Sequence, residues 1–429
     1  MFGNRIVKCA IPQCSAIKEL NMLNLLWTSF FIISFIAAMV QAVFLGNPQI
    51  WTILTNHLFE SATSAFQLAL NLTGMLCLWL GLLKIAEKSG LTELFANLLR
   101  PLFKIIMPEL PQNSPAIGSM VMNMAANMLG LDNAATPMGL KAMEQLQDAN
   151  PHKERASAAQ IMFIVLNASS LTILPISILM YRHLQGSANP GAVFVPILLA
   201  TLCSTLAGFL AVAFTQKLQI FNRKMLAYFG AIIAFIGLIA YGFYLLPTEK
   251  RLAYSETGGN ALILSFITFF LLFGAYKKLN LYETFISGAK EGFQIAVQII
   301  PYLVAMLTAI AVMRYSGVLD ALMWCFEKIF VLLNFDTGFI GALPTALMKP
   351  LSGNGARALM IETMQTYGVD SFPAFVSAVI QGSTETTFYV IALYFGAVKI
   401  SKTGAALPCA LFADFIGVVV AIVISYIFY

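Results

Sequence analysis

The stretch KPLSGNGARALMIETM, residues 349–364, decides how this chain folds. It places a lysine, an arginine, two glycines and an asparagine between two long apolar stretches. A lipid bilayer cannot satisfy the backbone groups that an interrupted helix leaves unpaired. We therefore expect this segment to be a break within a membrane helix, where its polar groups face protein, water or a ligand.

The composition of the whole chain supports a membrane setting. Of its 429 residues 59% are hydrophobic and only 10% are charged, whereas a soluble domain has roughly 25% charged residues. We expect an all-α integral membrane protein whose first partner is the lipid bilayer. The net charge is +5, and no basic patch with interleaved aromatic residues is present, which excludes nucleic acid as a partner.

Nine apolar runs are candidates to cross a hydrocarbon core of about 30 Å. They cover 22–45, 62–83, 158–180, 191–215, 226–246, 259–276, 290–313, 370–395 and 403–428. The first run follows Arg5, Lys8 and Lys18, so a signal peptide cleaved after Ala42 is the alternative to a helix. The run is longer than a typical signal core, which favours a retained helix.

Two further segments, 110–148 and 335–366, are apolar but interrupted by Pro, Gly, Asn and charged residues. We interpret them as re-entrant or broken helices. With nine full spans and the N-terminus in the cytoplasm, 18 lysines and arginines fall inside and 7 outside. This is the direction that the positive-inside rule requires, and it predicts an external C-terminus.

An internal repeat links the two halves of the chain. Residues 66–91 resemble 293–318 without a gap, and 166–181 align with 380–395. In the nine-span layout the repeated helices are an odd number of spans apart, which predicts an inverted-topology repeat with a ligand site at the midplane. The predicted organisation is an N-terminal segment 1–56, a first repeat 57–225, linking helices 226–284 and a second repeat 285–429.

Each broken segment is expected to restart as a helix inside the membrane. In the first, Gly130 and 132–133 break the helix, Thr136 is the expected N-cap, and a helix runs over 137–147. In the second, 350–355 break the chain, and Ser352 or Asn354 caps a helix over 356–367. A helix start leaves N–H groups unpaired and carries about half a positive charge, which favours an oxygen-rich or anionic ligand.

The expected binding residues surround these breaks and include the polar residues of 158–180 and 370–395. They are Asn123, Asn127, Asp132, Asn133, Thr136, Asn167, Ser169, Ser170, Lys349, Ser352, Asn354, Arg357, Gln381, Ser383, Thr384, Glu385 and Thr386. Glu385 is a carboxylate within an apolar run, where it can bind a cation, relay a proton, or pair with Lys349 or Arg357. The alternative for both breaks is that their polar residues only satisfy one another.

Several of these motifs are familiar. ANMLGLDNAATPMGLKAMEQLQ, LNASSLTILP and GSANP resemble spore maturation protein A, and PLSGNGARALMIETMQTYGVDSF, QGSTETTFYVIALYFGAVKISKT and ADFIG resemble spore maturation protein B. The chain is thus similar to a fusion of the two, over most of 60–215 and 285–429. Where the family has Gly-Leu-Gly-Asn, this chain has Asp132 in place of the second glycine.

The resemblance implies a place in the nucleoside-recognition or gate-domain group, whose members include parts of nucleoside carriers and of a ferrous-iron transporter. It implies a multi-pass protein of the bacterial cytoplasmic (inner) membrane. The group name implies a nucleoside ligand without establishing it.

Two functions remain open from the sequence. The first is a secondary carrier for a small polar or anionic solute, with a proton or sodium as the coupling ion at Glu385 or Asp132. The second is a non-transporting membrane scaffold or gate that works with envelope-maturation partners. We expect no enzyme, cofactor or metal site, because no nucleophile or ligand cluster is evident, and we expect a homo-oligomer.

Overall fold

The computed structural model describes residues 13–107, 109–111, 114–129, 132–218 and 223–429. For some of these residues, including 132–134, it describes the backbone and not the side chain. These residues form helices and no strand, as expected for an all-α membrane protein. The helices are α1 (Gln13–Phe44), α2 (Ile50–Lys88), α3 (Leu91–Ile106), α4 (Pro115–Met128), α5 (Asp132–Ala149), α6 (Ala158–Ser169), α7 (Ile176–Leu184), η1 (Pro190–Val193), α8 (Phe194–Thr215), α9 (Arg223–Leu245), α10 (Thr248–Tyr276), α11 (Leu281–Tyr315), α12 (Val318–Leu332), η2 (Ile340–Ala342), α13 (Leu343–Met348), α14 (Gly353–Tyr367), α15 (Phe372–Ser383), α16 (Thr387–Ala397) and α17 (Ala406–Phe428).

The order of elements recurs in the two halves. Each half has a long helix (α2, α11), a shorter one (α3, α12), a helical hairpin (α4–α5, α13–α14), a pair of short helices (α6–α7, α15–α16) and a long helix (α8, α17). Gly90 and Gly317 precede α3 and α12 with φ values of +82° and +76°. This left-handed conformation favours glycine, so the Ser-Gly pair shared by the repeated sequences has a structural cause.

Corresponding long helices pack against each other in opposite directions. In the α2–α11 pair, His57 stacks on Tyr315, while near the other end Lys84 lies 3.1 Å from Glu291. Glycine permits close backbone approach, because a Cβ at Gly288 would lie 2.2 Å from the Leu80 carbonyl oxygen.

The α8–α17 pair is also antiparallel. The Ser204 hydroxyl donates to the Ala413 carbonyl over 3.0 Å, and Thr215, further along α8, lies 3.8 Å from Cys409, earlier on α17. A Cβ at Gly208 would lie 3.1 Å from the Ala413 Cβ, so the two backbones are close here as well.

The runs 158–180 and 370–395 are not continuous helices, which corrects the sequence prediction. The first is α6 and α7 joined by the non-helical residues 170–175, where Ser170 has a φ of +22°, and the second is α15 and α16 joined by 384–386. The segments α6–α7 and α15–α16 cross at these breaks, where the Glu385 backbone N–H donates to the Ala168 carbonyl over 2.8 Å. Pro175 lacks an N–H and so cannot continue the hydrogen-bond pattern of a helix.

Six helices among the described residues are long and apolar enough to cross a membrane. They lie within Trp27–Phe44, Ile50–Lys88, Pro190–Thr215, Lys250–Tyr276, Leu281–Tyr315 and Ala406–Phe428. Several of the nine expected spans coincide with them, but 158–180 and 370–395 are pairs of short helices. The count of nine therefore stays a prediction, as does the inverted orientation of the repeat.

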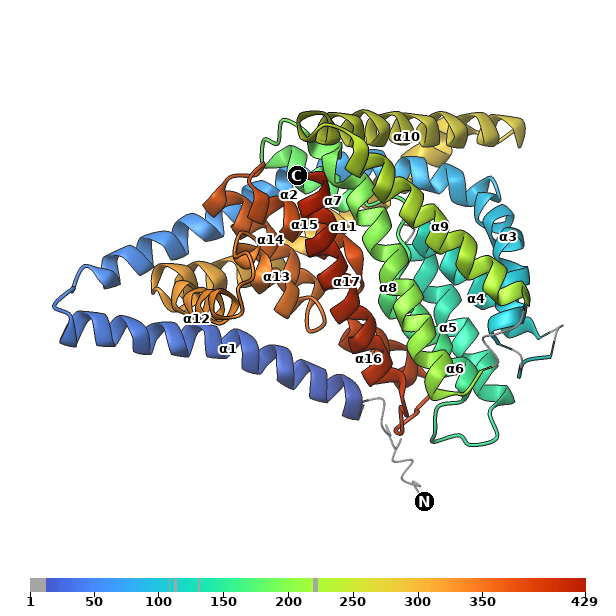
Figure 1. Cartoon of the computed structure of the whole chain (residues 1–429), viewed down its shortest axis with the longest axis horizontal. Helices are drawn as coiled ribbons and strands as arrows, with labels where there is room; N and C mark the ends of the chain where they lie inside the picture. The colour runs from blue at the N-terminus through green and yellow to red at the C-terminus, as the bar shows by residue number, and fades with distance from the viewer. Residues whose placement is uncertain (1–12, 108, 112–113, 130–131, 219–222) are drawn as a thin grey trace, which may run out of the picture.

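The crossing breaks separate two buried apolar clusters. One surrounds the first hairpin, α6 and α16, and the other surrounds α2, α11 and the second hairpin. Figure 1 shows α7 and α15 in the upper part of the molecule, with α6 and α16 below them. The polar breaks thus lie in the interior, between the two clusters.

Candidate functional site

The second hairpin restarts as a helix close to the predicted position. Residues 349–352 turn the chain, and Ser352 caps α14 by accepting a hydrogen bond from the Gly355 N–H at 3.1 Å. The helix begins at Gly353, three residues before the predicted start. Asn354 is not the cap, because its side-chain oxygen accepts from the Arg357 guanidinium at 3.2 Å. A fifteen-residue helix thus directs its N-terminus toward the centre of the molecule.

The first hairpin corrects the predicted N-cap. Helix α5 begins at Asp132, so Thr136 lies within it and Pro137 is an internal residue. A proline near a helix start removes one backbone hydrogen bond and does not prevent the helix. The expected break at Gly130 and the side chains of Asp132 and Asn133 lie outside the described residues.

A cavity of about 480 Å³ lies beside the crossing breaks. Both hairpins, both breaks, α7 and the α2–α11 pair contribute to its walls. The lining residues are Leu72, Leu76, Trp79, Leu80, Leu83, Asn127, Ser170, Thr172, Leu174, Pro175, Ile176, Ser177, Ile178, Met180, Tyr181, Ile295, Gln298, Ile299, Lys349, Gly353, Arg357, Met360, Gln381, Gly382, Thr384 and Glu385.

Three charged residues line this cavity. Lys349 is only 4% exposed, and its ammonium group donates to the Gln381 carbonyl over 2.8 Å. The Arg357 guanidinium lies 5.6 Å from the centre of the Tyr181 ring, a cation–π arrangement. The Glu385 side chain is exposed at the cavity wall. Two cations and one carboxylate therefore face the same space.

The structure brings seven of the predicted site residues to this cavity, and eight others whose side chains it describes do not line it. Asn127, Ser170, Lys349, Arg357, Gln381, Thr384 and Glu385 line it, whereas Asn123, Thr136, Asn167, Ser169, Ser352, Asn354, Ser383 and Thr386 do not.

Several of the second set are structural. Asn123 donates to the Ala135 carbonyl over 2.8 Å within the first hairpin, and Asn167 accepts from Asn127 at 3.0 Å. Ser169 and Ser383 donate to carbonyls three residues earlier in their own helices. Thr386 is buried beside Gly353.

Sequence reasoning missed the wall formed by the long helices. Trp79 and the leucines of α2, together with Gln298 of α11, face the cavity. Apolar residues on a membrane helix give the same signal whether they face lipid, protein or a ligand. Thr172 and Tyr181 were also missed as site residues, although both lie within the repeated block 166–181.

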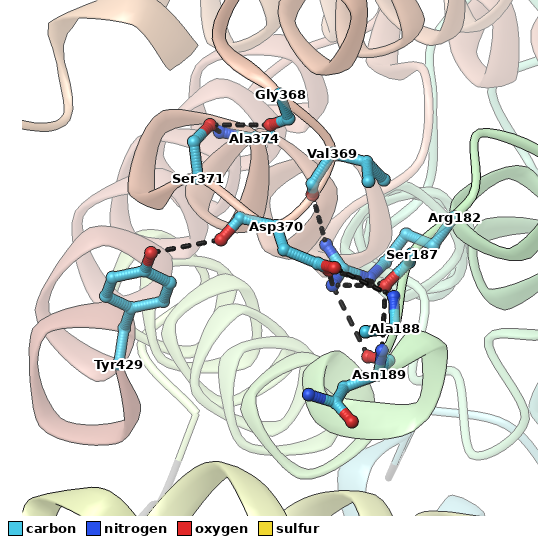
Figure 2. A network of polar contacts seen from close by, with 10 residues as sticks. All are labelled: Arg182, Ser187, Ala188, Asn189, Gly368, Val369, Asp370, Ser371, Ala374 and Tyr429. Atoms are coloured by element: carbon cyan, nitrogen blue, oxygen red, sulfur yellow. Dashed lines mark hydrogen bonds and ion pairs between the residues drawn. The ribbon is translucent and has the colours of Figure 1, made fainter.

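A buried polar network holds the end of α7 next to the start of α15. Arg182, 1% exposed, forms an ion pair with Asp370 at 2.8 Å and also donates to the Val369 and Asn189 carbonyls. Asp370 accepts from the Ala188 N–H at 2.8 Å, as Figure 2 shows. Tyr181, whose ring contacts the Arg357 guanidinium, directly precedes Arg182 in α7. The network therefore helps to position the ring that Arg357 contacts.

The opposite ends of the crossing helices are joined by backbone contacts. The Ala156 N–H donates to the Lys402 carbonyl, and the Lys402 N–H donates to the Glu154 carbonyl, both over 3.0 Å. These bonds join the loop before α6 to the loop after α16. The crossing segments therefore contact each other at both ends and at their breaks.

The family of the chain follows from a comparison with protein-family models. Residues 69–184 and 296–401 both match the Gate family, described as nucleoside recognition, and together they make up more than half of the chain. This chain belongs to the Gate family. The two matched regions lie within the predicted repeats 57–225 and 285–429, whose boundaries stay predictions.

Two relatives from Bacillus subtilis (strain 168) are similar to parts of this Gate protein. Spore maturation protein A is 37% identical over 183 residues, which are 43% of this chain and 90% of that protein. Spore maturation protein B is 46% identical over 164 residues, which are 38% of this chain and 90% of that protein. These matches confirm the resemblance read from the motifs. No solved structure matches the chain.

Proposed function

We propose that this Gate protein is a secondary carrier that binds a small polar or anionic solute in the cavity beside the crossing breaks. The observation that carries the proposal is the composition of the cavity wall. Charged and polar groups from both halves, including Asn127, Arg357 and Glu385, face one space of about 480 Å³. This size is within the usual range of small-molecule sites.

The energetics of the second hairpin support an oxygen-rich ligand. The start of α14 presents a positive dipole end, and Lys349 and Arg357 add two cations to the same wall. The Arg357 guanidinium contacts the Asn354 side-chain oxygen and the Tyr181 ring, neither of which is anionic. A carboxylate or phosphate group of a solute can therefore pair with it.

The packing of the two halves supports alternating access. Three pairs of corresponding elements, α2 with α11, α6–α7 with α15–α16, and α8 with α17, pack in antiparallel directions. This is the arrangement expected of an inverted-topology repeat, in which one half moves against the other around a fixed site. We place the protein in the bacterial inner membrane, with nine spans and a cytoplasmic N-terminus.

Glu385 is the proposed site of the coupling ion, a proton or sodium. The sequence left open an ion pair with Lys349 or Arg357, and the exposure of the Glu385 side chain at the cavity wall favours the ion site. Asp132, the other candidate from the sequence, has a side chain outside the described residues.

Uptake into proteoliposomes tests the carrier function. Purified protein is screened against nucleosides, organic acids and inorganic ions, with and without a proton or sodium gradient. We expect gradient-dependent uptake of one class, lost in the Arg357→Gln and Glu385→Gln variants and kept in Arg100→Gln, which changes an exposed arginine on α3. If the folded protein takes up no class of solute, the scaffold alternative is favoured. The same follows if cells that carry the Arg357→Gln/Glu385→Gln double variant behave like cells with the wild-type protein.

A further inference from the structure

The cavity has two chemically different walls. Helix α2 contributes Leu72, Leu76, Trp79, Leu80 and Leu83, which lie on one face because their spacing follows the helical period. Every α2 residue at the cavity is therefore apolar or an indole. This wall offers contact area and almost no hydrogen bonds.

Another part of the cavity lining carries the charge. Lys349 and Arg357 come from the second hairpin, and Gln381 and Glu385 come from the end of α15 and the break that follows. Gln381 is only 7% exposed, and its Oε1 has no hydrogen-bond partner among the described residues. A buried amide oxygen without a partner costs about 1–3 kcal/mol, so this wall is complete only when a donor occupies the cavity.

From these two walls we infer that the ligand is an amphipathic organic anion, with an acidic head group at Arg357 and Lys349 and an apolar body against Trp79 and the leucines of α2. The inference rests on the proposed ligand site. Arg357 forms no ion pair among the described residues and contacts only an amide oxygen and an aromatic ring, which favours one negative charge on the head group. A water bound to the head would donate to the Gln381 Oε1, because an ionised acid group has no hydrogen to donate.

Other solute classes fit the two walls less well. A nucleoside carries polar groups around both its base and its sugar, and burying some of them against α2 leaves hydrogen bonds unmade. An inorganic anion fits the charged wall and leaves the apolar wall in contact with water. An apolar body of aryl or alkyl type gains free energy from that wall in proportion to the area it buries.

Calorimetric binding tests this class independently of transport. The full chain is placed in nanodiscs of phosphatidylcholine and titrated with 3-phenylpropanoate, with acetate as the head alone, 3-phenylpropanol as the body alone, and uridine. We expect 3-phenylpropanoate to bind at least about ten-fold more tightly than each of the other three. Equal or tighter binding of uridine or acetate, or no binding of any probe, would overturn the inference.

Two variants assign the walls. Arg357→Gln should weaken 3-phenylpropanoate about ten-fold and leave 3-phenylpropanol unchanged, whereas Trp79→Ala should weaken both. The matched controls are Arg100→Gln and Trp324→Ala, which change an exposed arginine on α3 and an exposed tryptophan on α12. Folding of each variant is checked by its thermal transition. If neither wall variant changes the affinity of 3-phenylpropanoate, the assignment is wrong.

A free organic acid and an anionic lipid share this chemistry, so the titration is repeated in nanodiscs that contain phosphatidylglycerol. Unchanged affinity identifies a soluble acid, and competition that disappears in Arg357→Gln identifies a lipid head group. Both results support the class. Binding without uptake in proteoliposomes would contradict only the carrier function, whereas uptake of another solute without binding of 3-phenylpropanoate would contradict only this inference.

Discussion

At the scale of single residues, hydrogen bonds and ion pairs stabilise a charged side chain in the interior. Arg182 is only 1% exposed, and its guanidinium donates to Asp370 and to two backbone carbonyls, while Asp370 also accepts from the Ala188 N–H (Figure 2). A buried charge is tolerated when its partners are in place and destabilises when one is removed.

Replacing Asp370 with asparagine should therefore lower stability. The loss is about 1–3 kcal/mol, because the side chain of Asp370 is itself 40% exposed and Arg182 keeps its bonds to the carbonyls. The measurement is the thermal unfolding midpoint in detergent. The control is Glu60→Gln, which removes the partner of His57 in an exposed pair. Equal midpoints for the two variants would show that the network contributes nothing.

Most polar cavity residues were predictable from the sequence, because a lysine, arginine or glutamate within an apolar run is rarely accidental in a membrane protein. Lys349, Arg357 and Glu385 are examples. Asn123 and Ser169 gave the same signal but serve the packing of their own helices. Hydrogen bonds to nearby carbonyls cannot be told from ligand contacts without the fold. Trp79 gave no signal at all.

At the scale of elements, breaks in helices are the main feature that sequence reasoning found only in part. The breaks around 130 and 352 contain glycine with proline or charge, which interrupts hydropathy strongly. The breaks at 170–175 and 384–386 are short and polar but flanked by long apolar segments, so a window of membrane length averages over them. The clusters of polar residues in the motifs NASSLT and QGSTETT are the sequence indication of these two breaks.

The cap of α14 gives a prediction at this scale. Ser352→Ala removes the acceptor for the Gly355 N–H and should cost about 1 kcal/mol of stability. It should also reduce solute uptake, because the start of α14 lies at the cavity. As a control, Asn280→Ala removes the N-cap of α11, and Asn280 does not line the cavity. It should cost similar stability without changing uptake. Equal uptake by both variants would show that the start of α14 does not contribute to solute binding.

The close packing of α2 and α11 gives another. Gly288→Ala would bring a Cβ within 2.2 Å of the Leu80 carbonyl oxygen, so the helices must separate, at a cost of about 1–3 kcal/mol. Gly74→Ala changes a glycine of α2 with open space around it and should be neutral or stabilising by up to about 1 kcal/mol. Thermal midpoints that move in the same direction would contradict this packing.

At the scale of the whole molecule, the antiparallel pairing of corresponding long helices relates the two halves. From a weak internal repeat the sequence predicted an inverted-topology repeat, and that orientation in the membrane stays a prediction. Neither the pairing nor the repeat reveals where the membrane surfaces lie. The number of spans depends on those surfaces, so the count of nine stays a prediction beside the six long apolar helices of the described residues.

Inverted topology predicts that the loop before α6 and the loop before α15 lie on opposite faces of the membrane. Single cysteines replacing His152 and Ser371, in a background with the six native cysteines removed, report on these loops. In intact spheroplasts a membrane-impermeant maleimide should label position 371 at once and position 152 only after permeabilisation. Labelling of both from one face would exclude an inverted repeat.

The central claim is that a water-filled solute cavity exists between the two halves, inside the membrane. Ser177 lies on its wall and is exposed there, so a cysteine at this position in the same cysteine-free background reports on it most directly. The account predicts that a water-soluble maleimide labels this cysteine in protein embedded in nanodiscs, and that the bound solute slows the labelling. A cysteine that reacts only after denaturation would mean that hydrocarbon seals the cavity, and the carrier function would then be untenable.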